Sequence, residues 1–174
     1  NVKKILKDKK IFVNTSKGIE PDTGLRISEI VDEVLGDLVD SFVVLTGPSH
    51  AEEVVMNLPT VVSAASTNLE AAKLIQNIFS NDFSFRVYTI NDLVGAELGG
   101  SLKNIYAIAS GLLTGLNYGD NARAALITRA LVEMERLAVV MGANPKTLSG
   151  LVGVGDLIVT TTSYHSRNFQ AGLK

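Results

Sequence analysis

The sequence contains no cysteine, and its two histidines, His50 and His165, lie far apart. Without cysteine the chain has no disulfide framework and no thiolate zinc site. Two distant histidines make a poor metal cluster, so we expect no metal site. A reducing compartment suits this composition, and we therefore expect a cytoplasmic protein.

Long apolar runs and an excess of one charge are also absent. Stretches such as "FVVL" fall far short of the roughly 18–20 residues that span a bilayer, and no signal peptide is visible. The 16 Lys and Arg nearly balance the 18 Asp and Glu, which argues against nucleic-acid and membrane partners. We expect a soluble protein. Because the chain opens without Met and stops with no closing element, we also expect it to be a piece of something larger.

The first half of the chain alternates between two kinds of segment. Short β-rich runs cover residues 10–15, 41–47, 60–66 and 85–89, with amphipathic segments at 27–37 and 68–80 between them. Thr67 or Asn68 is placed to cap the second amphipathic segment. Strands that take turns with helices predict crossover units and a mostly parallel, doubly wound sheet.

The second half is rich in Ala, Gly and Leu and has helical periodicity. Asp92 can cap a helix that runs to about Ser110, Asp120 or Asn121 can cap another, and Pro145 suits the first turn of a third. The change of character predicts two parts. Residues 1–92 form an α/β layer, and residues 93–174 form a helical domain.

Lys103 stands in the apolar, small-residue stretch "GGSLKNIYAIASG". On a helix, Gly99, Gly100 and Ala107 surround it, so a second backbone or a ligand could approach closely. Burial disfavours the charged form of lysine, and a lysine with a lowered pKa can exchange a proton near neutral pH. The alternative is that Lys103 reaches water along its own stem. Spacing alone leaves both readings open.

Polar residues follow two of the predicted strands. Lys17 comes directly after the first, in "TSKGIE", and the turn "TGPSHAEE" follows the second. In that turn, Ser49 and Glu52 have capping-box spacing, so the following helix could present its N-terminus to an anion. Ligands of open α/β sheets gather beyond the carboxyl ends of strands. Both segments are therefore candidate ligand-binding loops, or else ordinary polar loops.

A last polar cluster lies between residues 150 and 168. Its "GVGDLI" has Ile158 where a dinucleotide fingerprint needs glycine, so we reject that match. Asp156 remains, after two glycines, and the run Ser166, Arg167 and Asn168 offers donors suited to a phosphate, although a polar loop or a helix cap explains this cluster better when it is taken alone. The segment "LIVTTT", residues 157–162, is β-prone in composition and predicts a strand.

Six segments occur together in this order: "SKGIE", "GPSHAEEV", "GAELGGSLKNIYAIASGLLTGL", "GDNARAALITRALVEMERLA", "LSGLVGVGDLIVTT" and "SRN". The combination closely resembles the NAD(P)-dependent sn-glycerol-3-phosphate dehydrogenases over nearly the whole chain. The resemblance implies a partial Rossmann-like doubly wound sheet followed by an all-helical domain, with "LIVTTT" helical. It also implies an oxidoreductase that interconverts sn-glycerol 3-phosphate and dihydroxyacetone phosphate with NAD or NADP, in glycerophospholipid precursor synthesis.

The resemblance also implies roles for individual residues. Lys103 matches the family's catalytic proton acceptor for the C2 hydroxyl. A small-molecule phosphate is the implied partner, with a homodimer as a possible assembly. The implied cofactor contacts are Lys17, Ala51 and Arg167, and the implied substrate contacts are Lys17, Gly47, Ser49, Lys103, Asn104, Asp156, Ser166, Arg167 and Asn168.

The sequence departs from the family because the N-terminal strand and its "GxGxxG" turn are missing. We therefore assign the function to the parent protein, and the preference between NAD and NADP stays open. Two alternatives are a related β-hydroxy acid or sugar-acid dehydrogenase and a non-catalytic helical interaction module. An enzyme requires Lys17, Lys103, Asp156 and Arg167 to converge around one cleft, whereas a module lets them scatter.

Overall fold

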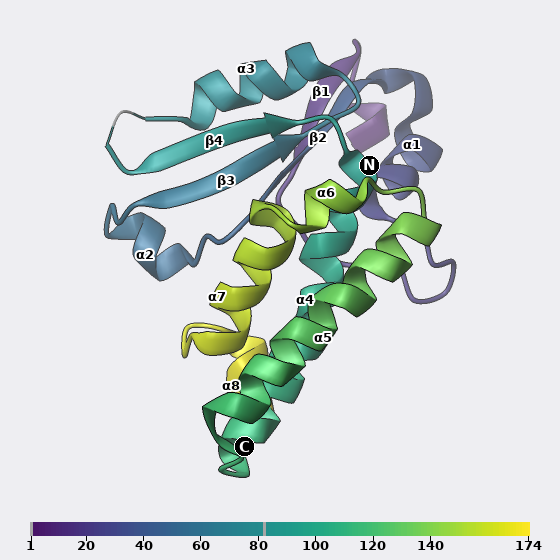
Figure 1. Cartoon of the computed structure of the whole chain (residues 1–174). Helices are drawn as coiled ribbons and strands as arrows, with labels where there is room; N and C mark the ends of the chain where they lie inside the picture. Colours follow the sequence, from purple (N-terminus) through teal and green to yellow (C-terminus); the bar gives the residue numbers. More distant parts are fainter. Residues whose placement is uncertain (1, 82) are drawn as a thin grey trace.

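The computed structural model describes residues 2–81 and 83–174, and it has two layers (Figure 1). A four-stranded sheet carries α3 on one face, and a group of helices built around the long α4 and α5 extends away from the sheet. Within the described part of the chain, no helix is both long and apolar enough to cross a membrane.

The sheet has the order β1 (Lys10–Asn14), β2 (Val39–Thr46), β3 (Thr60–Ala65), β4 (Phe85–Ile90). The outer pairs are parallel, and the central pair β2–β3 is antiparallel. The predicted Rossmann-like layer is thus confirmed, as a mixed sheet. The chain reverses between β2 and β3, where the five-residue helix α2 (Ala51–Val55) does not carry it back across the sheet to a parallel start.

Two longer helices complete the sheet layer, α1 (Ile27–Leu35) and α3 (Leu69–Phe79), with single turns at η1 (Val2–Lys4) and η2 (Gly36–Leu38). The predicted cap of α3 is confirmed as Asn68, whose side-chain oxygen accepts from the amides of Glu70 at 3.1 Å and Ala71 at 3.4 Å. Buried side chains of α3 then pack on the sheet, in a core of Val43, Val62, Ala64, Ala71, Ala72, Ile75 and Val87.

The second layer consists of helices, as predicted: α4 (Leu93–Gly115), α5 (Gly119–Val140), α6 (Pro145–Leu148), the π-helical turn η3 (Leu151–Gly155), α7 (Asp156–Thr162) and α8 (Arg167–Leu173). Asp92 caps α4 as expected, accepting from the amide of Gly95 at 2.9 Å. The predicted cap of α5 was wrong, because that helix begins at Gly119 and Asp120 lies within its first turn.

The segment "LIVTTT" is helical and forms most of α7, so the strand predicted from its β-prone composition was wrong. Its threonines bond back to carbonyls four residues earlier. Thr160 Oγ1 donates to the Asp156 carbonyl at 2.5 Å, and Thr161 Oγ1 donates to the Leu157 carbonyl at 2.7 Å. These bonds satisfy the hydroxyls within a buried helix, and tertiary burial outweighs the weak β preference of threonine.

The two layers meet at the first turns of α4. Glu97, almost fully buried there, accepts from Arg26 Nη1 at 2.9 Å and from the amide of Ser28 at 2.8 Å, which fixes the start of α1 against α4. A Cβ at Gly99 would collide with the carbonyl of Val152. Gly99 therefore serves close backbone approach, as the sequence predicted, whereas Gly100 faces the side chains of Thr46 and Lys17.

Candidate active site

Lys103 points into the protein from α4 and is 6% exposed. Its ammonium donates to Asp156 Oδ1 and to Thr160 Oγ1, the latter at 2.8 Å. Gly99 on α4 lets the backbone of η3, which leads directly into α7, come close to α4. Of the two readings that the sequence left open, the buried lysine is confirmed, and the lysine that reaches water is wrong.

Asp156 joins two lysines that lie far apart in the sequence. Its side chain is 1% exposed at the first position of α7. One carboxylate oxygen accepts from Lys103, and the other accepts from Lys17 at 2.7 Å. Lys17 comes from the loop after β1 and keeps a quarter of its side chain exposed. The cluster therefore connects the sheet layer to two helices of the second layer.

Burial lowers the pKa of Lys103 from its usual value near 10.5 to about 8. The negative charge of Asp156 opposes this by raising the pKa, and the positive charge of Lys17 lowers it further. Because the pKa lies near physiological pH, Lys103 exists in both protonation states there. This is the property that a group must have in order to take up and return a proton.

The turn after β2 lies beside this cluster. Gly47 has a φ of 147°, and a Cβ there would be 3.0 Å from the Cα of Val62, so glycine suits the position. Pro48 faces Gly155, the residue before Asp156; a Cβ at Gly155 would lie 3.6 Å from its ring. The predicted cap at Ser49 was wrong. Its hydroxyl donates back to the Gly47 carbonyl at 3.1 Å, so α2 begins one residue later than the capping box required.

The "SRN" run forms the start of α8. Ser166 is buried and caps the helix, accepting from the amide of Phe169 at 3.2 Å. The rings of His50 and His165 are 5.7 Å apart, which brings the loop before α8 next to the turn after β2. Arg167 is exposed and makes no ion pair with any carboxylate in residues 2–81 and 83–174. The side chains of Lys17, Lys103 and Asp156 thus meet in one cluster. That Arg167 lies around the same cleft stays a prediction.

The remaining predicted residues occupy two places. Asn104 follows Lys103 on α4 and is half-buried, and Asn168 is half-buried on α8. Ala51 begins α2 and lines a cavity of about 370 Å³ together with Lys17 and Ser49. That cavity has a polar part and an apolar part, and its other lining residues are Thr15, Leu45, Thr46, Val54, Val55, Val62 and Phe85.

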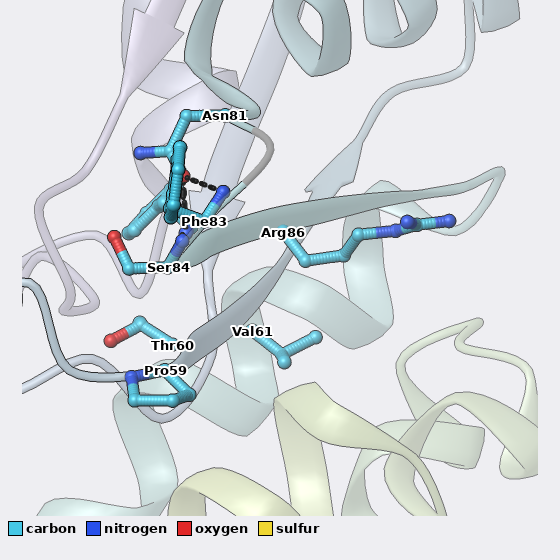
Figure 2. Close-up of a pocket in the computed structure, with 8 residues that line it drawn as sticks. Pro59, Thr60, Val61, Asn81, Phe83, Ser84 and Arg86 are labelled. Carbon is cyan, nitrogen blue, oxygen red and sulfur yellow. Dashed lines mark hydrogen bonds between the residues drawn. The ribbon is translucent and has the colours of Figure 1, made fainter.

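A second cavity, of about 320 Å³, lies at the starts of β3 and β4 (Figure 2). Asn81 lines this cavity, and its side-chain oxygen accepts from the amides of Phe83 at 3.1 Å and Ser84 at 2.7 Å. These bonds shape a loop, and none of the predicted site residues lines this cavity.

Two residues of the site escaped the sequence analysis. Thr160 holds the amine of Lys103, and helical spacing from Asp156 would have revealed it, since positions i and i+4 share a face. Thr46 ends β2 beside Lys17, and nothing in the sequence marks it. The described residues also contain no group of three or more His, Asp or Glu that could hold a metal ion.

Two family models cover most of the chain. Residues 1–72 match the N-terminus of NAD-dependent glycerol-3-phosphate dehydrogenase, and residues 92–174 match its C-terminus. The chain belongs to the NAD-dependent glycerol-3-phosphate dehydrogenase family. The order of the two matches agrees with the order of the sheet layer and the helical layer along the chain.

Curated members of this family resemble the chain closely. "Glycerol-3-phosphate dehydrogenase [NAD(P)+]" of Lysinibacillus sphaericus is 60% identical over 168 residues, covering 96% of this chain and 49% of the relative. The same enzyme of Bacillus subtilis is 59% identical over 165 residues, covering 94% and 48%. A crystal structure of glycerol-3-phosphate dehydrogenase from Coxiella burnetii superposes with a TM-score of 0.93 at 45% identity, covering 99% of this chain and 52% of that one. The chain thus spans about half the length of these relatives.

Proposed function

We propose that the protein that carries this chain interconverts sn-glycerol 3-phosphate and dihydroxyacetone phosphate, with NAD or NADP as the hydride carrier and Lys103 as the group that moves the proton. The observation that carries the proposal is the Lys103 amine, which is hydrogen-bonded to Asp156 and Thr160 and whose pKa is lowered to about 8 by burial. The proposal is supported by membership in the NAD-dependent glycerol-3-phosphate dehydrogenase family, whose reaction requires a group that exchanges a proton.

The chemistry of the alcohol explains why a lysine with a lowered pKa is useful. When the C2 carbon gives up its hydride, the hydroxyl proton must leave as the carbonyl forms, and neutral Lys103 accepts it. In the reverse direction, protonated Lys103 returns that proton to the oxygen of dihydroxyacetone phosphate. Asp156 and Thr160 hold the amine in one place through both steps.

The cavity beside the cluster fits the nicotinamide end of the cofactor. Its polar part offers the donors of Lys17, Thr46 and Ser49, and its apolar part contains Leu45 and Val62, against which a planar ring can lie. The bound cofactor accepts or supplies the hydride. We assign contacts with it to Lys17, Ala51 and Arg167.

We assign the substrate phosphate to the exposed donors near the start of α8. Arg167 offers a planar fork of N–H groups that matches phosphate oxygens, and Asn168 adds an amide beside it. Gly47 and Ser49 on the neighbouring turn, and Asn104 and Ser166, complete the proposed substrate group. The ring contact between His50 and His165 supports this grouping, because it joins the turn and the loop before α8.

The proposal extends to where and how the protein works. We infer a cytoplasmic location, since soluble nicotinamide cofactors are supplied there, and a homodimer as the assembly. We also treat residues 1–92 as part of a dinucleotide-binding domain and residues 93–174 as part of a substrate-binding helical domain. The change from sheet to helix between β4 and α4 supports that division.

The experiment that tests the proposal is an assay of the full-length enzyme that carries this sequence, with dihydroxyacetone phosphate and either NADH or NADPH. Oxidation of at least one cofactor that depends on the keto phosphate is the expected result. A β-keto acid lacking phosphate serves as the comparison substrate, because a related hydroxy-acid dehydrogenase would prefer it. No turnover with dihydroxyacetone phosphate and either cofactor would refute the proposal.

Arg167→Ala should raise the KM for dihydroxyacetone phosphate by about 10- to 100-fold and change kcat much less. The physical reason is that the phosphate is bound alike in the ground state and in the transition state. Steady-state kinetics on the full-length enzyme measures both constants. Arg129→Ala on α5, outside the proposed site, is the matched control, and an unchanged KM in Arg167→Ala would remove this residue from the phosphate site.

A further inference from the structure

The hydroxyl of Thr46 has no hydrogen-bond partner among the residues that the structure describes. Thr46 is 3% exposed at the end of β2, and its Oγ1 is the one buried side-chain polar atom in residues 2–81 and 83–174 that is left unsatisfied. Burying a hydroxyl without a partner destabilises the folded protein, and such groups are rare in native structures. A lone unsatisfied hydroxyl next to a candidate active site therefore needs a physical reason.

The surroundings of this hydroxyl connect it to the lysine cluster. A Cβ at Gly100 would lie 3.3 Å from Thr46 Oγ1 and 3.4 Å from both Cγ and Cδ of Lys17. The hydroxyl and the methylene stem of Lys17 thus both lie against the bare backbone of α4 at Gly100, one helical turn before Lys103. Neither that backbone nor that stem offers the hydroxyl a hydrogen-bond acceptor.

The neighbouring Lys17 side chain has room to move. Its ammonium is bound to Asp156 at 2.7 Å, and a quarter of the side chain remains exposed. Lys17 and Thr46 also line the same 370 Å³ cavity. A ligand that brings oxygen acceptors into that cavity competes with Asp156 for the ammonium, and Lys17 then shifts toward the ligand.

We propose that Thr46 is a ligand-binding residue, and that its hydroxyl donates a hydrogen bond to a carbonyl oxygen of the bound ligand once Lys17 turns from Asp156 toward the cavity. This inference rests on the proposed function, which supplies two such oxygens. One belongs to the carboxamide of the nicotinamide ring, and the other is the ketone of dihydroxyacetone phosphate.

The cavity favours the first of these two oxygens. Beyond Thr46 its wall is apolar, formed by Leu45, Val54, Val62 and Phe85. A flat heteroaromatic ring can bury its faces against such a wall, whereas a small polyol phosphate gains little there. The carboxamide on the ring then needs a polar partner at the edge of the apolar wall, which is where Thr46 lies.

The test compares three variants of the full-length enzyme. Thr46→Val replaces the hydroxyl with a methyl of the same shape, and Thr46→Ser keeps the hydroxyl. Thr60→Val is the matched control, since Thr60 is a buried threonine in the same sheet whose hydroxyl is satisfied by the Leu58 carbonyl at 3.0 Å. The measurements are the melting temperature without ligand, the Kd for NADH, and the Kd for dihydroxyacetone phosphate with NAD+ bound.

The proposal predicts opposite behaviour for the two valine variants. Without ligand, Thr46→Val should melt a few degrees above the wild type because a buried unsatisfied hydroxyl is removed, whereas Thr60→Val should melt below it. Thr46→Val should also weaken NADH binding about tenfold, the effect of one lost hydrogen bond, while Thr46→Ser and Thr60→Val bind within twofold of the wild type. If Thr46→Val instead weakens the binding of dihydroxyacetone phosphate tenfold, the proposal is supported, and the ketone oxygen is the acceptor.

Two results would overturn the inference. One is unchanged binding of both ligands by Thr46→Val, and the other is an equal loss in Thr60→Val. If Thr46→Val does not fold, Thr46→Ala makes the same comparison of Kd values. If the wild-type enzyme is active and Thr46→Val binds both ligands with the same Kd values as the wild type, only this inference is refuted. A wild-type enzyme that does neither refutes the proposed function.

Discussion

Lys103→Met in the full-length enzyme is expected to lower kcat by about 10²- to 10⁴-fold, the usual contribution of a positioned general acid or base. Methionine keeps most of the volume of lysine, so the contacts of α4 with α7 are preserved, and only the group that exchanges the proton is removed. Steady-state rates in both directions, together with a fluorescence titration of NADH, separate catalysis from binding. NADH affinity should stay within a few fold of the wild type.

A lysine outside the site serves as the control for that experiment. Lys73 lies half-exposed on α3, paired with Glu70 one turn away, and Lys73→Met should leave kcat unchanged. If Lys103→Met retains kcat within a few fold of the wild type, another group moves the proton, and the buried cluster has a structural role alone.

Asp156→Ala is expected to lower the free energy of unfolding by about 3–5 kcal/mol at pH 7, because it leaves buried positive charge without its partner. Asp156 is the common acceptor of Lys103 and Lys17, so one substitution breaks two ion pairs. Denaturant unfolding, followed by circular dichroism, gives the difference. Asp120→Ala is the control, since that exposed carboxylate pairs only with Arg123 on the surface of α5, and it should change stability little.

The pH dependence of this destabilisation has a definite sign. Asp156 raises the pKa of Lys103, so its removal moves that pKa further below the value of the unfolded chain, near 10.5. A lysine with a lowered folded-state pKa destabilises the fold while it is protonated, and this cost disappears as pH rises toward the unfolded-state pKa. Between pH 7 and pH 10, the gap in stability between Asp156→Ala and the wild type should therefore narrow steadily as pH rises. A gap that widens with rising pH would contradict this account of the cluster.

The sequence was sufficient where local rules dominate. Alternation of β-rich and amphipathic segments predicted the sheet layer, and Asp92 and Asn68 cap the helices that they were expected to cap. The small residues beside Lys103 predicted close approach, which is confirmed at Gly99, and they left burial of the lysine as one of two readings, which the structure decides. These features depend on neighbours within one or two turns.

The sequence failed where distant segments decide the outcome. Residues 157–162 form a helix because their threonines bond within α7 and pack against α4, which their β-prone composition does not reveal. Ser49 is a local exception, since it was misassigned as a cap although its hydroxyl donates back to the Gly47 carbonyl two residues earlier. No local pattern could join Lys17 to Asp156, 139 positions apart, or show that the buried hydroxyl of Thr46 is unsatisfied within the described part of the chain.

The central claim is that one buried amine with a pKa of about 8 accepts the proton in one direction and donates it in the other. The most direct test is the pH profile of kcat/KM for both reactions of the full-length enzyme. Oxidation of sn-glycerol 3-phosphate needs neutral Lys103, so its rate should rise through about pH 8 and level off. Reduction of dihydroxyacetone phosphate needs protonated Lys103, so its rate should fall through the same pH. Profiles that bend in the same direction, or that show no transition near pH 8, would contradict the claim.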